Sequence, residues 1–167
     1  AIILDTGCGK GESSIYLAEK FPDHLIIAID KSADRLDSLN KAKPQNLEFF
    51  RTDLIDFWMV AQKNRWIFEK TYLLYPNPWP KSEHARRRWH MHAIFPAILE
   101  TSKKLELRSN WLIYIQEFAQ AFKLATEQTP SYQIFTPNPP VTAFERKYAR
   151  DHQTLYQLEL SIPFVQI

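Results

Sequence analysis

Glycine is scarce in this chain. Only three of its 167 residues are glycine, and all three lie in the short stretch DTGCGKG, from Asp5 to Gly11. This scarcity excludes collagen-like and glycine-rich low-complexity proteins, which need the residue throughout. A chain that keeps its glycine in a single loop must have a local reason for it, because glycine lowers the stability of a fold wherever its conformational freedom is not needed.

Cysteine and long apolar runs are scarce as well. The one cysteine, Cys8, excludes an internal disulfide and fits a reducing compartment, so we expect a cytoplasmic protein. No run approaches the roughly 18 apolar residues that a membrane span needs, and no signal peptide is visible, so we expect no membrane partner. The chain opens without a Met inside the apolar run Ala1–Leu4, and we expect residues that precede it to be missing.

The net charge is small too. A formal value of +2 over the whole chain is too weak to indicate a nucleic-acid partner by itself. Apolar residues are plentiful, at 45%, and aromatic residues make up 14%. This composition is typical of a packed globular protein and excludes disorder, and the length is that of one ordinary domain over residues 1–167.

Apolar runs alternate with helical patterns along the chain, which indicates an α/β fold with a parallel sheet. The predicted strands are Ile2–Leu4, Leu25–Ile29, Leu47–Arg51, Thr71–Tyr75, Trp111–Ile115, Tyr132–Phe135 and Thr154–Leu160. The predicted helices are Glu12–Lys20, Ala33–Lys41 behind an N-cap at Ser32, Ile55–Gln62, a basic helix from about Glu83 that kinks near Pro96, and Glu117–Glu127. Because the strands are short and continuously apolar, helices should cover both faces of the sheet.

Polar side chains follow four of the predicted strands, at the point where each strand ends. These residues are Asp5, Asp30, Asp53 and Asn77. In open α/β sheets ligands bind at the carboxyl ends of the strands, close to the point where the strand order reverses. The sequence therefore predicts a ligand site at this edge of the sheet.

The glycine loop connects a predicted strand to a predicted helix as Gly7-x-Gly9-x-Gly11. Such a turn is used where the backbone must come close to a ligand and side chains would collide with it. Asp30, at the end of the next strand, is placed to accept hydrogen bonds from two ribose hydroxyls. The alternative interpretation is a tight strand-to-helix turn without a ligand, and three clustered glycines in a glycine-poor chain disfavour it.

The spacing of the loop, with Asp5 before it, resembles the first motif of class I S-adenosylmethionine-dependent methyltransferases. The resemblance implies that Asp5 and the loop backbone hold the methionine part of the cofactor, that Asp30 holds its ribose, and that Asp53 reads the adenine amino group. The full set of cofactor-binding residues that it implies is Asp5, Gly7, Cys8, Gly9, Gly11, Asp30, Lys31, Asp53, Leu54 and Asn77. A dinucleotide-dependent enzyme is the competing interpretation, and the glycine spacing does not support it.

A second informative stretch follows the fourth predicted strand. Pro76, Pro78 and Pro80 stiffen a loop that contains Asn77 and Trp79. The segment after it is cationic, through Lys81, His84, Arg86, Arg87 and Arg88. Consecutive arginines on a helix cannot all point into a core, and a phosphate backbone could engage several of them. A solvated basic face is the alternative, and the neighbouring cofactor loop favours nucleic acid.

This loop and basic segment resemble the Pro-Asp-Pro-Trp-Pro-Lys signature of the tRNA (guanine-N7)-methyltransferase family. The late block Pro140–Lys147, PVTAFERK, resembles the Pro-x-Thr-x-Phe-Glu-x-Lys block of the same family. The resemblance runs from Asp5 to about Leu158. It implies a Rossmann-like class I fold with a mostly parallel seven-stranded sheet, S-adenosylmethionine as cofactor, tRNA as partner, and methylation of a guanine in the variable loop.

The resemblance also assigns roles on the acceptor side. It implies catalytic positions for Asn77, Thr142 and Glu145, and tRNA or substrate contacts for Lys81, His84, Arg86, Arg87, Arg88, Thr142 and Glu145. Guanine N7 has a free lone pair and no proton, so the methyl can move by in-line displacement without a general base. Catalysis should then depend on positioning and on electrostatic stabilisation of the cationic product. No metal ion is implied.

The chain departs from the family pattern mainly on the acceptor side. Asn77 stands where the family has Asp, so an acceptor oxygen is kept and the negative charge is lost. The family has Thr-Asp after its fifth strand, and the predicted strands place Ile115-Gln116-Glu117 there. The family's basic N-terminal arm is absent from this sequence.

Three other functions stay open at this point. One is a relative that binds cofactor and RNA with weak or no turnover. Another is methylation of a nucleobase amine, because those enzymes carry an Asp/Asn-Pro-Pro-aromatic loop that resembles Asn77-Pro78-Trp79. The third is a small-molecule methyltransferase. The sequence leaves monomer and homodimer equally open.

Overall fold

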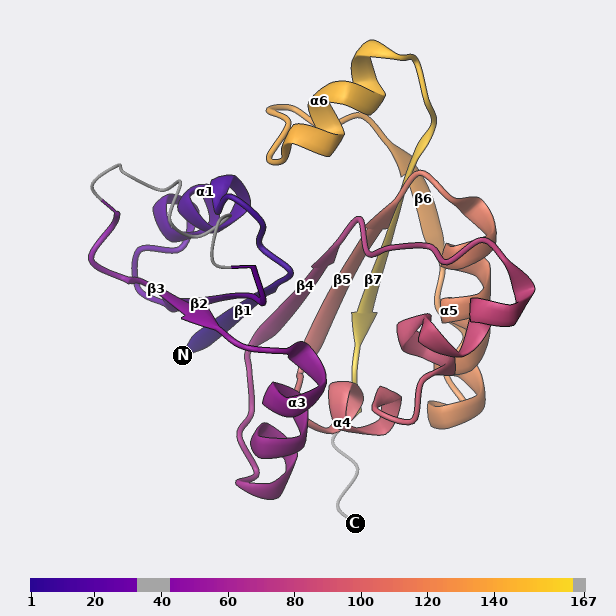
Figure 1. The fold of residues 1–167 in the computed structure, drawn as a ribbon, viewed down its shortest axis with the longest axis horizontal. Helices are drawn as coiled ribbons and strands as arrows, with labels where there is room; N and C mark the ends of the chain where they lie inside the picture. The colour runs from indigo at the N-terminus through magenta and orange to yellow at the C-terminus, as the bar shows by residue number, and fades with distance from the viewer. Residues whose placement is uncertain (33–42, 164–167) are drawn as a thin grey trace.

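A computed structural model of the protein describes residues 1–32 and 43–163. The helix predicted at 33–41 lies outside the described residues. Within them the strands form a seven-stranded sheet in the order β3-β2-β1-β4-β5-β7-β6 (Figure 1). The strands are β1 (Ile2–Thr6), β2 (Leu25–Asp30), β3 (Leu47–Arg51), β4 (Lys70–Leu74), β5 (Lys104–Ser109), β6 (Tyr132–Phe135) and β7 (Leu155–Ser161).

The sheet is parallel from β3 to β5, and β7 runs antiparallel to both β5 and β6. β1 lies near the middle and pairs with β2 on one side and with β4 on the other. The strand order therefore reverses between β1 and β4, which is where ligands bind in sheets of this kind. The mostly parallel seven-stranded α/β sheet expected from the sequence is confirmed.

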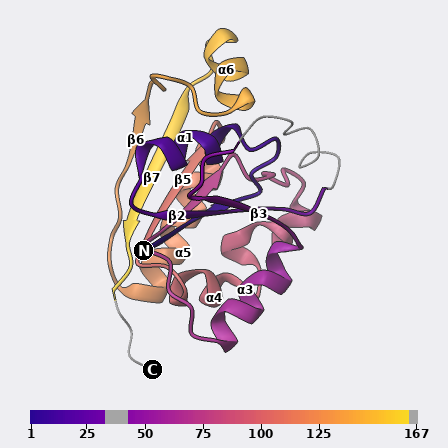
Figure 2. The same cartoon turned by 90° about the vertical axis from the view of Figure 1, so that its left-hand side faces the viewer.

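Helices α1 (Glu12–Lys20), α3 (Leu54–Lys63), α4 (Phe95–Glu100) and α5 (Leu112–Thr126) pack on the two faces of the sheet, and a further helix, α6 (Ala143–Arg150), lies beyond the strand ends. Successive residues of β1 point to opposite faces of the sheet: Ile3 packs with Leu17 of α1, whereas Leu4 packs with Ala61 of α3. A larger core lies between the sheet and α3, α4 and α5, and Figure 2 shows α3 and α4 together, away from α1.

The fifth strand was predicted at the wrong place. β5 is Lys104–Ser109, and the apolar run Trp111–Ile115 mostly belongs to α5, where Tyr114 and Ile115 are buried. The stretch KLELRS carries three ionisable residues among only two apolar ones, so it was not recognised as a buried strand. It forms a central strand because Glu106 and Arg108 on one face pair with each other, while Leu105 and Leu107 of the other face enter the core.

The basic segment does not form the predicted α-helix either. It folds as two short 3-10 helices, Ser82–Arg87 and Trp89–Met91, and Pro96 lies in the first turn of α4 and kinks nothing. Arg88 separates the two with an extended backbone, φ −67° and ψ 135°. That conformation breaks the helix and turns the Arg88 side chain inward.

The late block also contains a helix that the sequence pattern does not predict, α6. Its sequence AFERKYAR is short and half of its residues are charged, so its apolar side consists of little more than Phe144 and Tyr148. Figure 1 shows α6 beyond the upper ends of β4 and β5, with α1 to one side. Among the described residues, no helix is long and apolar enough to cross a membrane.

Candidate functional site

The three glycines all have a left-handed backbone. Their φ angles are 63° at Gly7, 56° at Gly9 and 76° at Gly11. A side chain would strain each position, because L-residues rarely adopt such angles. A Cβ atom added at Gly7 or Gly9 would meet nothing within 4 Å. The loop is therefore bent by its backbone, and open space lies beside it for a ligand.

Asp5 is buried directly beneath this loop. Its Oδ2 accepts hydrogen bonds from the Ser13 and Ser14 hydroxyls at 2.7 and 2.6 Å, both from the first turn of α1. Its Oδ1 is buried and has no partner among the described residues. Burial raises the pKa of Asp5 to about 6, against the hydroxyl hydrogen bonds that lower it. A buried carboxylate oxygen without a partner fits the ammonium group of an amino-acid ligand.

Asp30 fastens the glycine loop to the end of β2. Its Oδ2 accepts from the Gly9 backbone N–H at 2.9 Å, and its Oδ1 accepts from the Ser32 N–H at 2.9 Å. The side chain is 4% exposed. The predicted juxtaposition of Asp5, the glycines and Asp30 is therefore found in the structure. Lys31, next to Asp30, is exposed.

Cys8 lies inside the loop and faces the core. Its backbone N–H donates to the Ile29 carbonyl at 3.0 Å, and its side chain packs with Leu17 and Ala18 of α1. Burial raises the pKa of the thiol, and the carboxylates of Asp5 and Asp30 raise it further. The thiol is consequently an unreactive packing group, and the backbone of Cys8 is what the loop uses.

Asp53 and Leu54 follow β3 at the same edge of the sheet. β3 pairs with β2 so that Arg51 lies opposite Asp30, and the Thr52 N–H donates to the Asp30 carbonyl at 3.2 Å. The exposed Asp53 caps α3 by accepting from the Ile55 N–H at 2.8 Å, and Leu54 is half-buried. Both therefore lie beside the end of β2, where the sequence places an adenine contact.

The proline-rich loop leaves β4 through two residues with positive φ, Tyr75 at 52° and Trp79 at 45°. Between them the Asn77 Oδ1 accepts from the Trp79 backbone N–H at 3.2 Å, which closes a local turn. Asn77 itself is exposed. Because β4 is the parallel neighbour of β1, this loop and the glycine loop leave the sheet at adjacent strand ends.

The cations after the loop fall into two classes. Lys81, Arg86 and Arg87 are exposed, and the Arg87 guanidinium lies over the Trp79 ring at 4.7 Å from its centroid. The half-buried His84 packs edge-on against the same ring at 5.6 Å. These residues form a cationic surface that packs on the Trp79 ring, and such a surface suits a phosphate backbone.

Arg88 belongs to the second class and corrects the prediction that the whole arginine cluster faces a substrate. It is 9% exposed and donates from Nη1 to both carboxylate oxygens of Glu117, at 3.0 and 2.7 Å. Its Nε and Nη2 donate to the Trp79 carbonyl at 3.2 and 3.0 Å. Arg88 therefore fixes the proline-rich loop to α5 from the inside.

Glu117 is shared with His90, whose Nε2 lies 2.9 Å from Glu117 Oε2. Burial acts to raise the pKa of Glu117, but hydrogen bonds from His90 and Arg88 outweigh it and the pKa is lowered. Since β5 ends at Ser109, the residues that follow the fifth strand are Asn110 and Trp111. Glu117 is therefore not the counterpart of the family's acid after the fifth strand. It lies within α5, where it binds Arg88 and His90.

The late block is built as a capped helix. The Thr142 hydroxyl accepts from the Glu145 N–H at 3.0 Å and so caps α6. The Glu145 carboxylate accepts from the Val141 N–H at 2.7 Å, from the Tyr75 hydroxyl at 2.9 Å and from Arg108 Nη1 at 2.7 Å. Glu145 is fully buried, so direct contact with an acceptor base would require these bonds to break.

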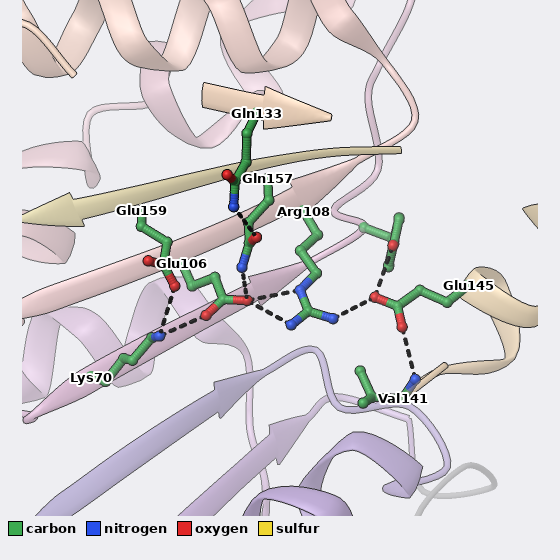
Figure 3. A network of polar contacts seen from close by, with 9 residues as sticks. Lys70, Glu106, Arg108, Gln133, Val141, Glu145, Gln157 and Glu159 are labelled. Atoms are coloured by element: carbon green, nitrogen blue, oxygen red, sulfur yellow. Dashed lines mark hydrogen bonds and ion pairs between the residues drawn. The ribbon is translucent and has the colours of Figure 1, made fainter. Parts of the chain in front are cut away.

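A chain of ion pairs continues from Glu145 across the sheet (Figure 3). Arg108 lies between Glu145 and Glu106, and Glu106 also accepts from Lys70 Nζ at 2.6 Å. Burial acts to raise the pKa of Glu106, but Arg108 and Lys70 outweigh it and hold the pKa low. Sequence reasoning missed this network, although the alternation of charged and apolar residues in KLELRS was a signal for it.

A second contact joins α6 to the cofactor side. Arg146 donates from Nη1 and Nη2 to the Glu12 carboxylate at 2.6 and 3.0 Å, and Glu12 is the first residue of α1. Thr142 therefore stands at the start of a helix that reaches both the β4–β5 edge and the glycine loop. Within residues 1–32 and 43–163, no group of three or more His, Cys, Asp or Glu could hold a metal ion.

The chain is similar to known methyltransferases in sequence. The family model described as "Putative methyltransferase" matches residues 1–158. A tRNA (guanine-N(7)-)-methyltransferase of Zymomonas mobilis is 32% identical over 105 residues, 60% of this chain and 45% of that protein. Proteins of the same name from Exiguobacterium and Lactococcus lactis are 24% and 25% identical and are matched over 95% of this chain and 78% of their own length.

Solved structures are similar in fold. An antibiotic-related methyltransferase has a TM-score of 0.68 at 12% identity, and the 16S rRNA methyltransferase KamB has 0.66 at 16%; both alignments cover 96% of this chain and 87% of theirs. The plantazolicin methyltransferase BpumL, solved with SAH, has a TM-score of 0.60 at 15% identity, over 98% of this chain and 76% of that one. These likenesses establish a class I methyltransferase fold.

Proposed function

Because the chain belongs to the methyltransferase family whose model spans residues 1–158, we propose that it transfers a methyl group from S-adenosylmethionine to N7 of a guanine in tRNA. Relatives matched over 95% of the chain bear the name of that activity. The observation that carries the proposal is the meeting of two loops at adjacent strand ends: the glycine loop after β1 and the loop of Asn77 after β4.

The residues present fit the cofactor. The unpartnered Oδ1 of Asp5 would accept from its ammonium group, and the bare backbone at Gly7 and Gly9 leaves room for its methionine part. Asp30 and Asp53 would accept from the ribose and the adenine amino group, respectively. When bound, the cofactor supplies an electrophilic methyl on a sulfonium. The proposed binding set is completed by Cys8, Gly11, Lys31, Leu54 and Asn77.

On the acceptor side, the chain has to orient guanine N7, because this nitrogen needs no base to become a nucleophile. The Asn77 amide would hold the base by hydrogen bonds. Thr142, the N-cap of α6, would make a second contact with it. Lys81, His84, Arg86 and Arg87 would bind tRNA phosphates around the site. We further propose a guanine of the variable loop as the acceptor, a single domain over residues 1–167, and action in the cytoplasm.

The test is mass spectrometry of nucleosides from unmodified tRNA incubated with the protein and S-adenosylmethionine. We expect N7-methylguanosine from a single position. Gly9→Val is the matched negative control, because its side chain is strained at a φ of 56° and occupies the open space beside the loop. Methylation of an exocyclic amine instead, or none by protein that binds both cofactor and tRNA, would contradict the proposal.

Asn77→Asp separates a slow enzyme from a binding-only relative. A carboxylate keeps the acceptor oxygen that the Trp79 N–H needs and adds charge opposite the cationic product, so an existing transfer rate should rise severalfold. No transfer by either form would favour binding without turnover.

A further inference from the structure

Three aromatic rings meet where α6 stands over the end of β4. Tyr75, the first residue after β4, lies 6.4 Å from Phe144 and 5.7 Å from Tyr148, measured between ring centroids. Phe144 and Tyr148 are 6.0 Å apart and close to parallel, with 23° between their planes. We call these three residues the aromatic cluster. Phe144 and Tyr148 are the two large aromatic residues of α6, and Phe144 is 54% exposed.

The cluster is anchored to the sheet through Glu145. Glu145, next to Phe144, is fully buried and accepts from the Tyr75 hydroxyl and from Arg108. Figure 3 shows this carboxylate at the end of the ion-pair chain through Arg108 and Glu106. The rings therefore lose little further freedom when a flat ligand stacks on them, which favours binding.

The cluster also lies between the two halves of the proposed site. Tyr75 precedes the loop of Asn77, and Arg146 ties the same helix to Glu12, the residue after Gly11. Figures 1 and 2 both show α6 beyond the strand ends. The exposed Phe144 ring therefore lies at the same end of the sheet as the glycine loop and the loop of Asn77.

We infer that Phe144 and Tyr148, supported by Tyr75, form the surface on which the acceptor guanine stacks; the inference rests on the proposed function. Every base has a π-face, and unpaired RNA bases stack on aromatic side chains. Methylation at N7 makes the guanine cationic, and aromatic faces attract cations. Glu145 cannot supply that charge directly, because Arg108 already neutralises it. The rings therefore stabilise the developing charge that the buried carboxylate does not reach.

The experiment compares Phe144→Leu with Phe144→Tyr. Leucine keeps an apolar side chain of similar bulk and loses the π-face, whereas tyrosine keeps the π-face. With wild-type tRNA we expect kcat/KM for methyl transfer to fall about tenfold in the leucine variant and to stay close to the wild-type value in the tyrosine variant.

A second measurement reports directly on stacking of the acceptor base. A tRNA that carries 2-aminopurine in place of the acceptor guanine is titrated with protein in the presence of S-adenosylhomocysteine. Stacking quenches 2-aminopurine, so we expect quenching with the wild type and with Phe144→Tyr, and much less with Phe144→Leu. Leu124→Ala, an exposed apolar residue of α5 at 76% exposure, is the matched control and should match the wild type in both measurements.

The outcomes separate the two proposals. If the wild type methylates guanine N7 and Phe144→Leu matches it in rate and quenching, the stacking inference is wrong and the proposed function stands. If the wild type makes no N7-methylguanosine, both are wrong. Thermal unfolding excludes misfolding as the cause, because an exposed side chain should leave the midpoint of the leucine variant unchanged; if that midpoint falls, the comparison is repeated with Tyr148→Leu against Tyr148→Phe.

Discussion

At the scale of single residues, neighbours in the sequence have opposite environments. Arg87 and Arg88 are adjacent, yet Arg87 is exposed over Trp79 and Arg88 is buried against Glu117. The charge run predicts cations near the site, and it cannot predict which of them turns inward. That choice depends on Glu117, which lies on another helix and is brought close only by the fold.

This contrast predicts different effects on stability. Arg88→Ala leaves Glu117 and the Trp79 carbonyl without their donors and should lower the free energy of unfolding by about 2 kcal/mol, since Glu117 is partly exposed. Arg87→Ala should change it by less than about 0.5 kcal/mol. Urea unfolding of both variants measures this, and equal losses would contradict the two environments.

Asp5 links stability and cofactor binding to pH. Its pKa in the folded chain, about 6, lies above the ordinary value of 3.8, so the folded state holds the proton more tightly. The stability that this group contributes is present in full below pH 3.8 and is lost as the pH rises through 6. A ligand ammonium at Oδ1 would favour the charged form and offset this loss.

Cofactor affinity should therefore rise with pH. If only the ionised Asp5 binds, affinity for S-adenosylhomocysteine increases about tenfold between pH 5 and pH 7. Titration calorimetry across this range measures it. In Asp5→Asn the dependence should vanish; a variant that keeps the full slope would assign the titration to another group.

At the scale of elements, the sequence predicted the cofactor half more accurately than the acceptor half. β3 and α1 have the predicted bounds, and β1 and β2 extend the predicted strands by two residues and one. β1 and β2 gave clear signals because each is a short apolar run with an Asp at or near its end. β5 and α6 were missed, because their charged residues are satisfied by partners far along the chain: Glu106 by Lys70, and Glu145 by Tyr75. The alternation in KLELRS favours a strand, but a local pattern does not identify partners so far away in the sequence.

The anchoring of α6 can be tested through Glu145→Gln. The amide loses the ion pair with Arg108 at a fully buried position, and we expect the free energy of unfolding to fall by about 3 kcal/mol. Hydrogen exchange should show the backbone amides of α6 losing protection. Glu83→Gln, an exposed acid in the basic segment, is the control and should leave both quantities unchanged.

At the scale of the whole molecule, the charge is nearly balanced. With a net value of +2, the overall field gives little attraction for RNA, so tRNA binding has to come from the local cationic surface. Lys81, Arg86 and Arg87 are its exposed members. The sheet supplies the geometry, because the reversal of strand order between β1 and β4 brings this surface beside the glycine loop.

Salt dependence measures how local the binding is. If these three cations each release one counterion, the logarithm of the tRNA association constant should fall against the logarithm of salt concentration with a slope of about −3. Arg87→Ala should reduce the slope by about 1. A much steeper slope, unchanged in that variant, would place the phosphate contacts elsewhere on the molecule.

The buried position of Cys8 has a practical consequence for labelling. It is the one thiol of the chain, and its side chain points from the glycine loop into the core, where burial raises its pKa. Maleimides and spin labels should leave it untouched while they react with a cysteine placed on the surface. The native protein is therefore ready for site-directed probes without first removing a cysteine, and slow alkylation of Cys8 itself would report how often the loop opens.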